Sequence, residues 1–87
     1  MSTYNVRLLL KRNGKVSDDL FDADDGDFCG MMPAIGDRIV HMLKNGAEGY
    51  RVMDRIFEMG GRADYVTLIV EEESTKDINH LGRFALL

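Results

Sequence analysis

The first part of the chain alternates between apolar and polar residues. Over residues 4–11 the even positions are apolar and the odd positions are polar, with Leu9 as the exception. A period of two is typical of a β-strand. The Asn13-Gly14 pair that follows favours the positive φ angles of a two-residue hairpin turn. The pattern therefore predicts a hairpin whose second strand runs over about residues 15–21.

The middle of the chain has no such periodicity. Residues 22–36 contain three glycines, one proline and four aspartates, which predicts an irregular crossing or a long loop. The segment 33–44 allows two interpretations, because its apolar residues also fit a helix that begins at Pro33. Gly36 would cost such a helix about 1 kcal/mol. We therefore favour a turn at Gly36 and a strand from about residue 38, with the helix as the alternative.

The second half predicts another hairpin. Residues 50–58 carry apolar side chains at alternate sites, Gly60-Gly61 turns the chain, and residues 65–70 form a nearly continuous apolar run. The apolar segment 83–87 is expected to dock as a last short strand. The sequence thus predicts a mostly β fold of five or six strands, with α+β as the alternative if the helix forms.

Short motifs in this half carry a resemblance to known proteins. The run PAIGDRI at 33–39 precedes YRV at 50–52, and a glycine-containing turn leads to VTLIV at 66–70. This order resembles small, mostly uncharacterised bacterial and phage proteins with SH3-like barrels, over residues 33–73. The resemblance implies a small antiparallel β-barrel. It also implies binding to peptides, partner proteins or nucleic acids rather than catalysis.

The length and the charge of the chain exclude some classes of function and favour others. A chain of 87 residues, 45% of them hydrophobic, predicts one domain over residues 1–87 with a modest core and excludes a multidomain enzyme. Its formal charge is -4, from 15 acidic and 11 basic side chains. Six aspartates fall within an irregular acidic segment expected at about residues 18–32; they are Asp18, Asp19, Asp22, Asp24, Asp25 and Asp27. Such a run would attract a basic protein surface, whereas the overall acidity disfavours non-specific binding to nucleic acid.

The residues give little indication of calcium binding, a catalytic cysteine or zinc binding. If Gly26 were the sixth position of a calcium loop, Phe21 would be the first, and it offers no carboxylate. Carboxylates near Cys29 disfavour its thiolate form and therefore a role as a nucleophile. We expect this cysteine to be a small apolar residue that is buried or half-buried. His41 and His80 lie 39 positions apart and have no zinc-ligand spacing. We therefore assign no catalytic residue, no metal and no cofactor.

The number of cysteines and the length of the apolar runs indicate the cellular compartment of the protein. A lone cysteine cannot form a disulfide within the chain, which fits a reducing environment. No apolar stretch approaches the 18 or more residues of a membrane span. We expect a cytoplasmic protein.

These observations predict a non-enzymatic protein-interaction or accessory module that uses the acidic segment, of which a phage-type inhibitor is one form. The alternative is a small nucleic-acid-binding barrel that uses Arg38, Arg51 and Arg55 on a basic strand face. Apolar side chains on both faces of residues 65–70 also suggest a homodimer through this strand or through the edge at 83–87. The partner protein is left unidentified.

Overall fold

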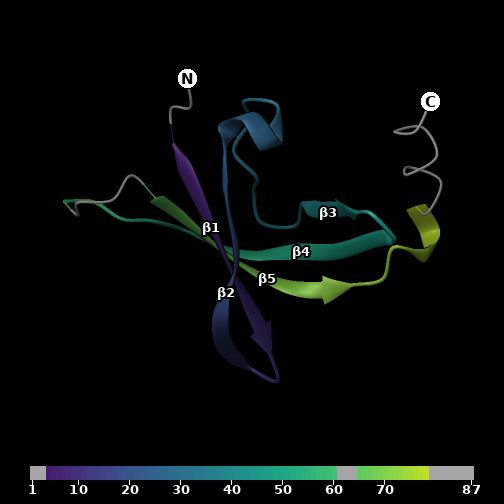
Figure 1. The fold of residues 1–87 in the computed structure, drawn as a ribbon. Coiled ribbons are helices and arrows are strands. Elements are labelled where there is room, and N and C mark those ends of the chain that lie inside the picture. The colour runs from purple at the N-terminus through teal and green to yellow at the C-terminus, as the bar shows by residue number, and fades with distance from the viewer. Residues whose placement is uncertain (1–3, 61–64, 79–87) are drawn as a thin grey trace.

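The structure, a computed structural model, describes residues 4–60 and 65–78, and of residues 18–21 and 25 only the backbone. Five strands form one sheet in the order β2-β1-β5-β4-β3 (Figure 1). The strands are β1 (Asn5–Arg12), β2 (Lys15–Asp24), β3 (Arg38–Leu43), β4 (Gly46–Phe57) and β5 (Tyr65–Glu73). Two short 3-10 helices complete the described elements, η1 (Asp25–Phe28) after β2 and η2 (Lys76–Ile78) after β5.

The centre of the sheet is a parallel pair. β1 and β5 run in the same direction, with Leu8 opposite Leu68 and Val6 opposite Val66, while all other neighbouring strands are antiparallel. The chain therefore forms the β1–β2 hairpin, crosses to the far edge at β3, and returns through β4 to place β5 against β1. In Figure 1 the β1–β2 hairpin crosses the β4–β5 hairpin, so the sheet is strongly twisted.

One face of the sheet carries the hydrophobic core. Residues opposite one another in a sheet share a face, so alternate residues of β1, β5 and β4 meet there. The buried apolar side chains are Val6, Leu8, Leu10, Tyr50, Val52, Val66, Leu68 and Val70. Phe28 and Met32, from the segment that links β2 to β3, pack against them together with Ile39. The crossing segment thus covers part of the core instead of looping into solvent.

Three predictions from local patterns are confirmed. The fold is mostly β. Asn13 and Gly14 have φ values of 52° and 76°, as a two-residue hairpin turn with two left-handed residues requires. Residues 38–43 form a strand and not the alternative helix. Gly36 adopts φ 94° and its N–H donates to the Val52 carbonyl, which ends the crossing and aligns β3 with β4.

The sheet differs from the expected antiparallel barrel in two respects. It is not closed, and its central pair is parallel. Turn residues specify antiparallel neighbours, but no turn joins β1 to β5, so the sequence carried no local signal for their pairing. The chain leaves β2 through η1 and crosses to the opposite edge before β3 begins, which leaves β2 and β3 as two separate edges of the sheet.

The acidic run also differs from its prediction. β2 continues to Asp24, three residues beyond the expected end at Phe21, so most of the run lies on a strand and not in an irregular loop. Pairing with β1 explains the extension, because Ala23 lies opposite Val6 and packs against the core. The segment 83–87, expected as a last strand, lies outside the described residues. No helix in the described part of the chain has the length and apolar character needed to cross a membrane.

Leu8 tests the importance of the central pair. It has no exposed surface, whereas Leu43 at the end of β3 keeps 43% of its surface exposed. Replacing Leu8 by alanine should lower the free energy of unfolding by about 2–5 kcal/mol, because it removes buried methyl groups and leaves a cavity. The same change at Leu43 should lower it by less than about 1 kcal/mol. Urea unfolding of both variants measures the difference, and similar losses would contradict the position of the core.

Candidate functional site

The six aspartates lie along one edge of the sheet. Four belong to β2, whose only partner among the described strands is β1, and the other two belong to η1. We call these residues the acidic edge: Asp18, Asp19, Asp22, Asp24, Asp25 and Asp27. The structure thus brings together all the aspartates that the sequence singled out, on an edge strand and the turn that follows it. The exposed side chains of Asp22 and Asp27 face solvent from these two elements.

Two members of the acidic edge have a structural task. Asp24 Oδ1 accepts hydrogen bonds from the backbone N–H groups of Gly26 at 2.9 Å and Asp27 at 3.3 Å. In return, Asp27 Oδ2 accepts a hydrogen bond of 3.0 Å from the Asp24 N–H. Each carboxylate satisfies backbone donors at the start of η1, as aspartates commonly do in turns. The sequence signal for this reciprocal turn was the D-x-G-D pattern at 24–27.

Asp22 has a different environment. It lies opposite Arg7 of β1, and the Arg7 guanidinium stacks over the Tyr65 ring, 4.6 Å from its centroid. Arg7 Nε is buried and has no hydrogen-bond partner within the described part of the chain. Among the side chains that the structure describes, the Arg7 cation is thus held by an aromatic ring, on the strand next to β2.

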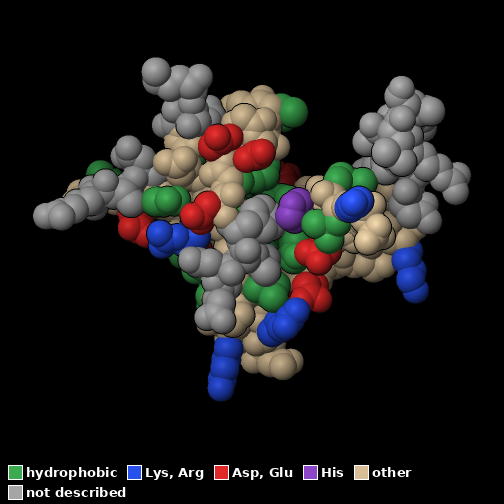
Figure 2. All heavy atoms as spheres, in the orientation of Figure 1, with side chains coloured by type: hydrophobic (Ala, Val, Ile, Leu, Met, Phe, Trp, Pro, Cys, Tyr) green, Lys and Arg blue, Asp and Glu red, His purple; other side chains and the backbone are tan. Residues whose placement is uncertain are grey.

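A small hollow adjoins the acidic edge. It has a volume of about 310 Å³ and lies between β2 and η1 on one side and β3 on the other. We call it the edge hollow; its lining residues are Asp22, Ala23, Asp27, Phe28, Ile39, Val40 and His41. Figure 2 shows acidic and apolar side chains next to one another on the visible face of the molecule. The edge hollow therefore combines an apolar floor with carboxylates at its rim, a combination that sequence reasoning missed because it joins segments distant in the chain.

The three arginines of the alternative nucleic-acid site all contact other groups of the protein. Arg38 and Arg51 lie opposite each other on β3 and β4, and both form ion pairs with Glu73 at 2.9 and 2.8 Å. Arg38 also donates two hydrogen bonds of 2.9 Å to Asp77, which hold the pKa of that carboxyl below its usual value. Arg55 donates to the Pro33 carbonyl at 3.3 Å and lies over the Phe57 ring. The predicted basic face is thus a network of ion pairs and backbone contacts.

A second, more polar hollow of about 690 Å³ lies where β4, β5 and the end of β1 meet. In its wall the Tyr50 hydroxyl donates to Glu48 Oε2 at 2.6 Å, and Arg12 forms an ion pair with Glu72. Burial, followed by the hydrogen bond to Glu48, raises the pKa of Tyr50 to about 12. The hydroxyl therefore stays protonated at neutral pH and has the character of a structural donor.

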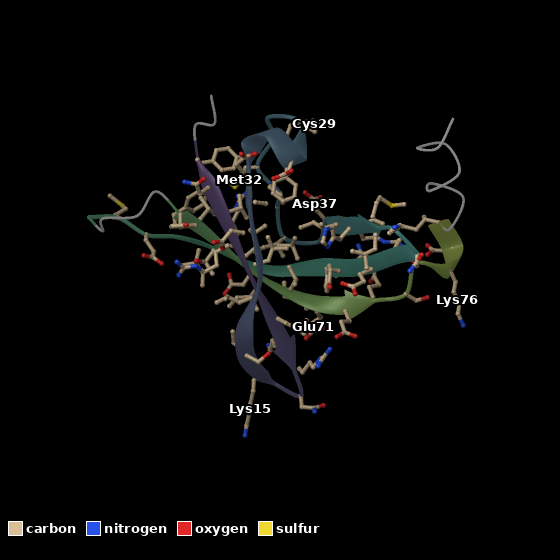
Figure 3. The ribbon with its side chains drawn as sticks, viewed as in Figure 1. Lys15, Cys29, Met32, Asp37, Glu71 and Lys76 are labelled. Atoms are coloured by element: carbon tan, nitrogen blue, oxygen red, sulfur yellow. The ribbon has the colours of Figure 1, made fainter. Side chains whose placement is uncertain are left out.

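The remaining candidate groups do not assemble into a site. Cys29 is exposed, not buried as expected, because it follows η1 with φ 56° at the outer end of the crossing segment (Figure 3). His41 is half-buried on β3, and His80 lies outside the described residues. No group of three histidine, cysteine or acidic residues in the described ranges could hold a metal ion.

Comparisons with known proteins do not assign a function to this chain. A scan with protein-family models, a search of curated proteins and a search of solved structures each found no match to this chain. The resemblance to SH3-like barrels over residues 33–73 therefore stays a prediction.

The reciprocal turn separates structural from exposed aspartates. Asp24→Ala removes an acceptor that serves two backbone N–H groups, so it should lower the free energy of unfolding by about 1 kcal/mol. Asp22→Ala removes an exposed carboxylate and should change it by less than about 0.5 kcal/mol. Urea unfolding at pH 7 compares the two variants. If Asp22→Ala were the more destabilising, the assigned roles would be reversed.

The raised pKa of Tyr50 should make the free energy of unfolding fall at alkaline pH. An unfolded tyrosine ionises near pH 10, whereas the pKa of Tyr50 in the folded chain is about 12. The unfolded state therefore loses the proton first, so this contribution to stability is complete below pH 10 and is lost between pH 10 and about 12. Urea unfolding across this range should show a steeper decline for the wild type than for Tyr50→Phe. Equal slopes would contradict the raised pKa.

Proposed function

We propose that this protein is a non-enzymatic protein-interaction module that binds a basic segment of another protein through the acidic edge. The observation that carries the proposal is the placement of six aspartates along β2 and η1, at an edge of the sheet where no other described strand pairs with β2. Sheet edges are common docking sites for extended segments, because their backbone groups can pair with another chain. Carboxylates along such an edge favour a partner rich in lysine and arginine.

Charge balance elsewhere in the molecule supports this choice over nucleic acid. A phosphate backbone would have to displace Glu73 and Asp77 from Arg38 and Arg51 before it could contact their guanidinium groups. It would also approach a chain with a formal charge of -4. The residues that the sequence suggested for nucleic-acid binding, which the structure describes, thus form no available basic surface.

We also propose a biological form for such a module. A phage-type inhibitor that occupies a basic surface of its target would use the acidic edge in this way. A cytoplasmic setting fits the exposed thiol of Cys29, the lone cysteine of the chain, because reducing compartments keep such thiols free. β5 lies between β1 and β4 and so offers no edge for a homodimer, and the segment 83–87 lies outside the described residues. A homodimer through the outer face of β5 stays a prediction.

Selection of peptides from a random phage-displayed library tests the proposal. The test variant is Asp18→Asn, Asp19→Asn and Asp22→Asn, which leaves the structural Asp24 and Asp27 intact. The matched control is Asp54→Asn, Glu58→Gln and Glu71→Gln, which brings the formal charge from -4 to the same -1. Peptides selected on the wild type should be enriched in lysine and arginine, bind the control within about twofold, and bind the test variant about tenfold more weakly.

Two results would contradict the proposed function. One is the absence of any enriched peptide. The other is a set of peptides that bind the test variant and the control equally well, which would make the acidic edge a solvated surface that only maintains solubility. Fluorescence anisotropy with a labelled oligonucleotide completes the experiment, because tight binding that Arg38→Gln and Arg51→Gln abolish would favour the nucleic-acid alternative.

A further inference from the structure

We propose that the edge hollow receives an extended partner segment, with an apolar side chain in the hollow and a flanking lysine or arginine at Asp22 and Asp27. The inference rests on the proposed function and deepens it, because it assigns where on the acidic edge the partner lies and what chemistry it carries. The occupant is a segment of a different protein, and not a second copy of this chain.

Both walls of the edge hollow come from strands at the edge of the sheet. β2 and β3 lie at opposite ends of the strand order, yet residues of both line the same hollow of about 310 Å³. The twist of the sheet therefore brings its two edges toward each other without pairing them. A volume of this size is at the lower end of the range for ligand pockets, about 300–1,000 Å³. It suits one or two side chains of an extended segment and not a folded element.

Backbone groups on both walls point away from the strands that β2 and β3 pair with. The Asp24 N–H donates to Asp27, so it points away from β1, and the alternation of an antiparallel pair makes the backbone of Asp22 point the same way. On the other wall, Val52 of β4 exchanges hydrogen bonds with Gly36 and Asp37. The same alternation turns the backbone of Ile39 toward β4 and that of Val40 outward. An extended segment would therefore find a backbone donor and acceptor on each side.

Side chains define what the segment carries. Ala23, Phe28 and Ile39 form the floor, and all three also pack against the hydrophobic core, so their positions are set before binding. The exposed carboxylates of Asp22 and Asp27 stand at the β2 side of the rim. An apolar side chain next to a cationic one matches this surface in both shape and charge.

Charge also distinguishes a partner from a second copy. Two copies that paired through β2 would place their acidic edges against each other, and like charges directly opposite in a sheet destabilise the pairing. Charged residues on edge strands are a common protection against such self-association. A basic segment experiences attraction from the same carboxylates. The acidic edge therefore favours a heterologous occupant.

A synthetic peptide of alternating lysine and valine, six residues long and blocked at both ends, is the probe. It is titrated into the ¹⁵N-labelled full chain, and amide chemical shifts report where it binds. Shift changes should appear on both walls, at Asp22, Phe28, Ile39, Val40 and His41. A glutamate–valine peptide should not bind. A lysine–valine peptide with alternate backbone amides methylated keeps charge and shape but should bind more than about tenfold more weakly, because it loses backbone pairing.

Two variants complete the test. Asp22→Asn should weaken binding of the lysine–valine peptide about threefold, as expected for one partly exposed ion pair, while the matched Glu58→Gln should leave it unchanged. Val40→Pro removes the backbone donor inferred to face the hollow, which an edge strand tolerates, and it should weaken binding about tenfold. An unchanged ¹⁵N spectrum away from β3 verifies that this variant folds.

The outcomes separate this inference from the proposed function. Shift changes along β2 and η1 without any on β3 would overturn the inference and leave the proposed function standing. Equal binding of the glutamate–valine peptide would overturn both. A dimer of the free protein in light scattering, with the same β3 residues changing shift on dilution, would assign the edge hollow to a second copy and overturn the inference.

Discussion

The parallel contact between β1 and β5 is the interaction on which the rest of the structure depends. It joins the first and last strands of the described chain and aligns their buried residues, with Leu8 beside Leu68 and neither exposed to solvent. Without it, the β1–β2 hairpin and the three-stranded unit of β3, β4 and β5 would be separate, and an isolated hairpin is only marginally stable in water. Sheet order, core and the two edges all follow from this contact.

The same contact determines which strands stay at the edges. With β1 and β5 at the centre, β2 and β3 each have one neighbour among the described strands. An edge strand can pair with other chains. β3 is short, at 6 residues, which limits what can pair with it. β2 is longer, at 10 residues, and carries the aspartates. Like charges would oppose pairing of this longer edge with a second copy, and under the proposed function the same carboxylates attract a strand of opposite charge.

Local signals in the sequence were sufficient for most of the strands but not for the full length of β2 or for the assembly of the sheet. The Asn13-Gly14 turn and the strand over 38–43 depend on the φ preferences of a few residues, so the sequence indicates them directly. The parallel central pair and the open sheet arise from contacts between residues about 60 positions apart, for which no turn gives a signal. The candidate site divides in the same way. The aspartates were visible as a run, whereas the edge hollow and the ion pairs of Arg38 and Arg51 exist only once the strands are in register.

Recognition of a basic segment at this surface, as we propose it, would require both charge and shape. Exposed ion pairs contribute only about 0–1 kcal/mol each, so the acidic edge by itself would speed the approach of a basic partner without holding it firmly. Burial of an apolar side chain contributes more, about 1.5–3 kcal/mol for a residue of the size of valine or leucine. The apolar floor at Phe28 and Ile39 supplies that burial directly beside the carboxylates. A partner that offered charge alone, such as a flexible lysine tail, would therefore bind more weakly than a segment that alternates cationic and apolar residues.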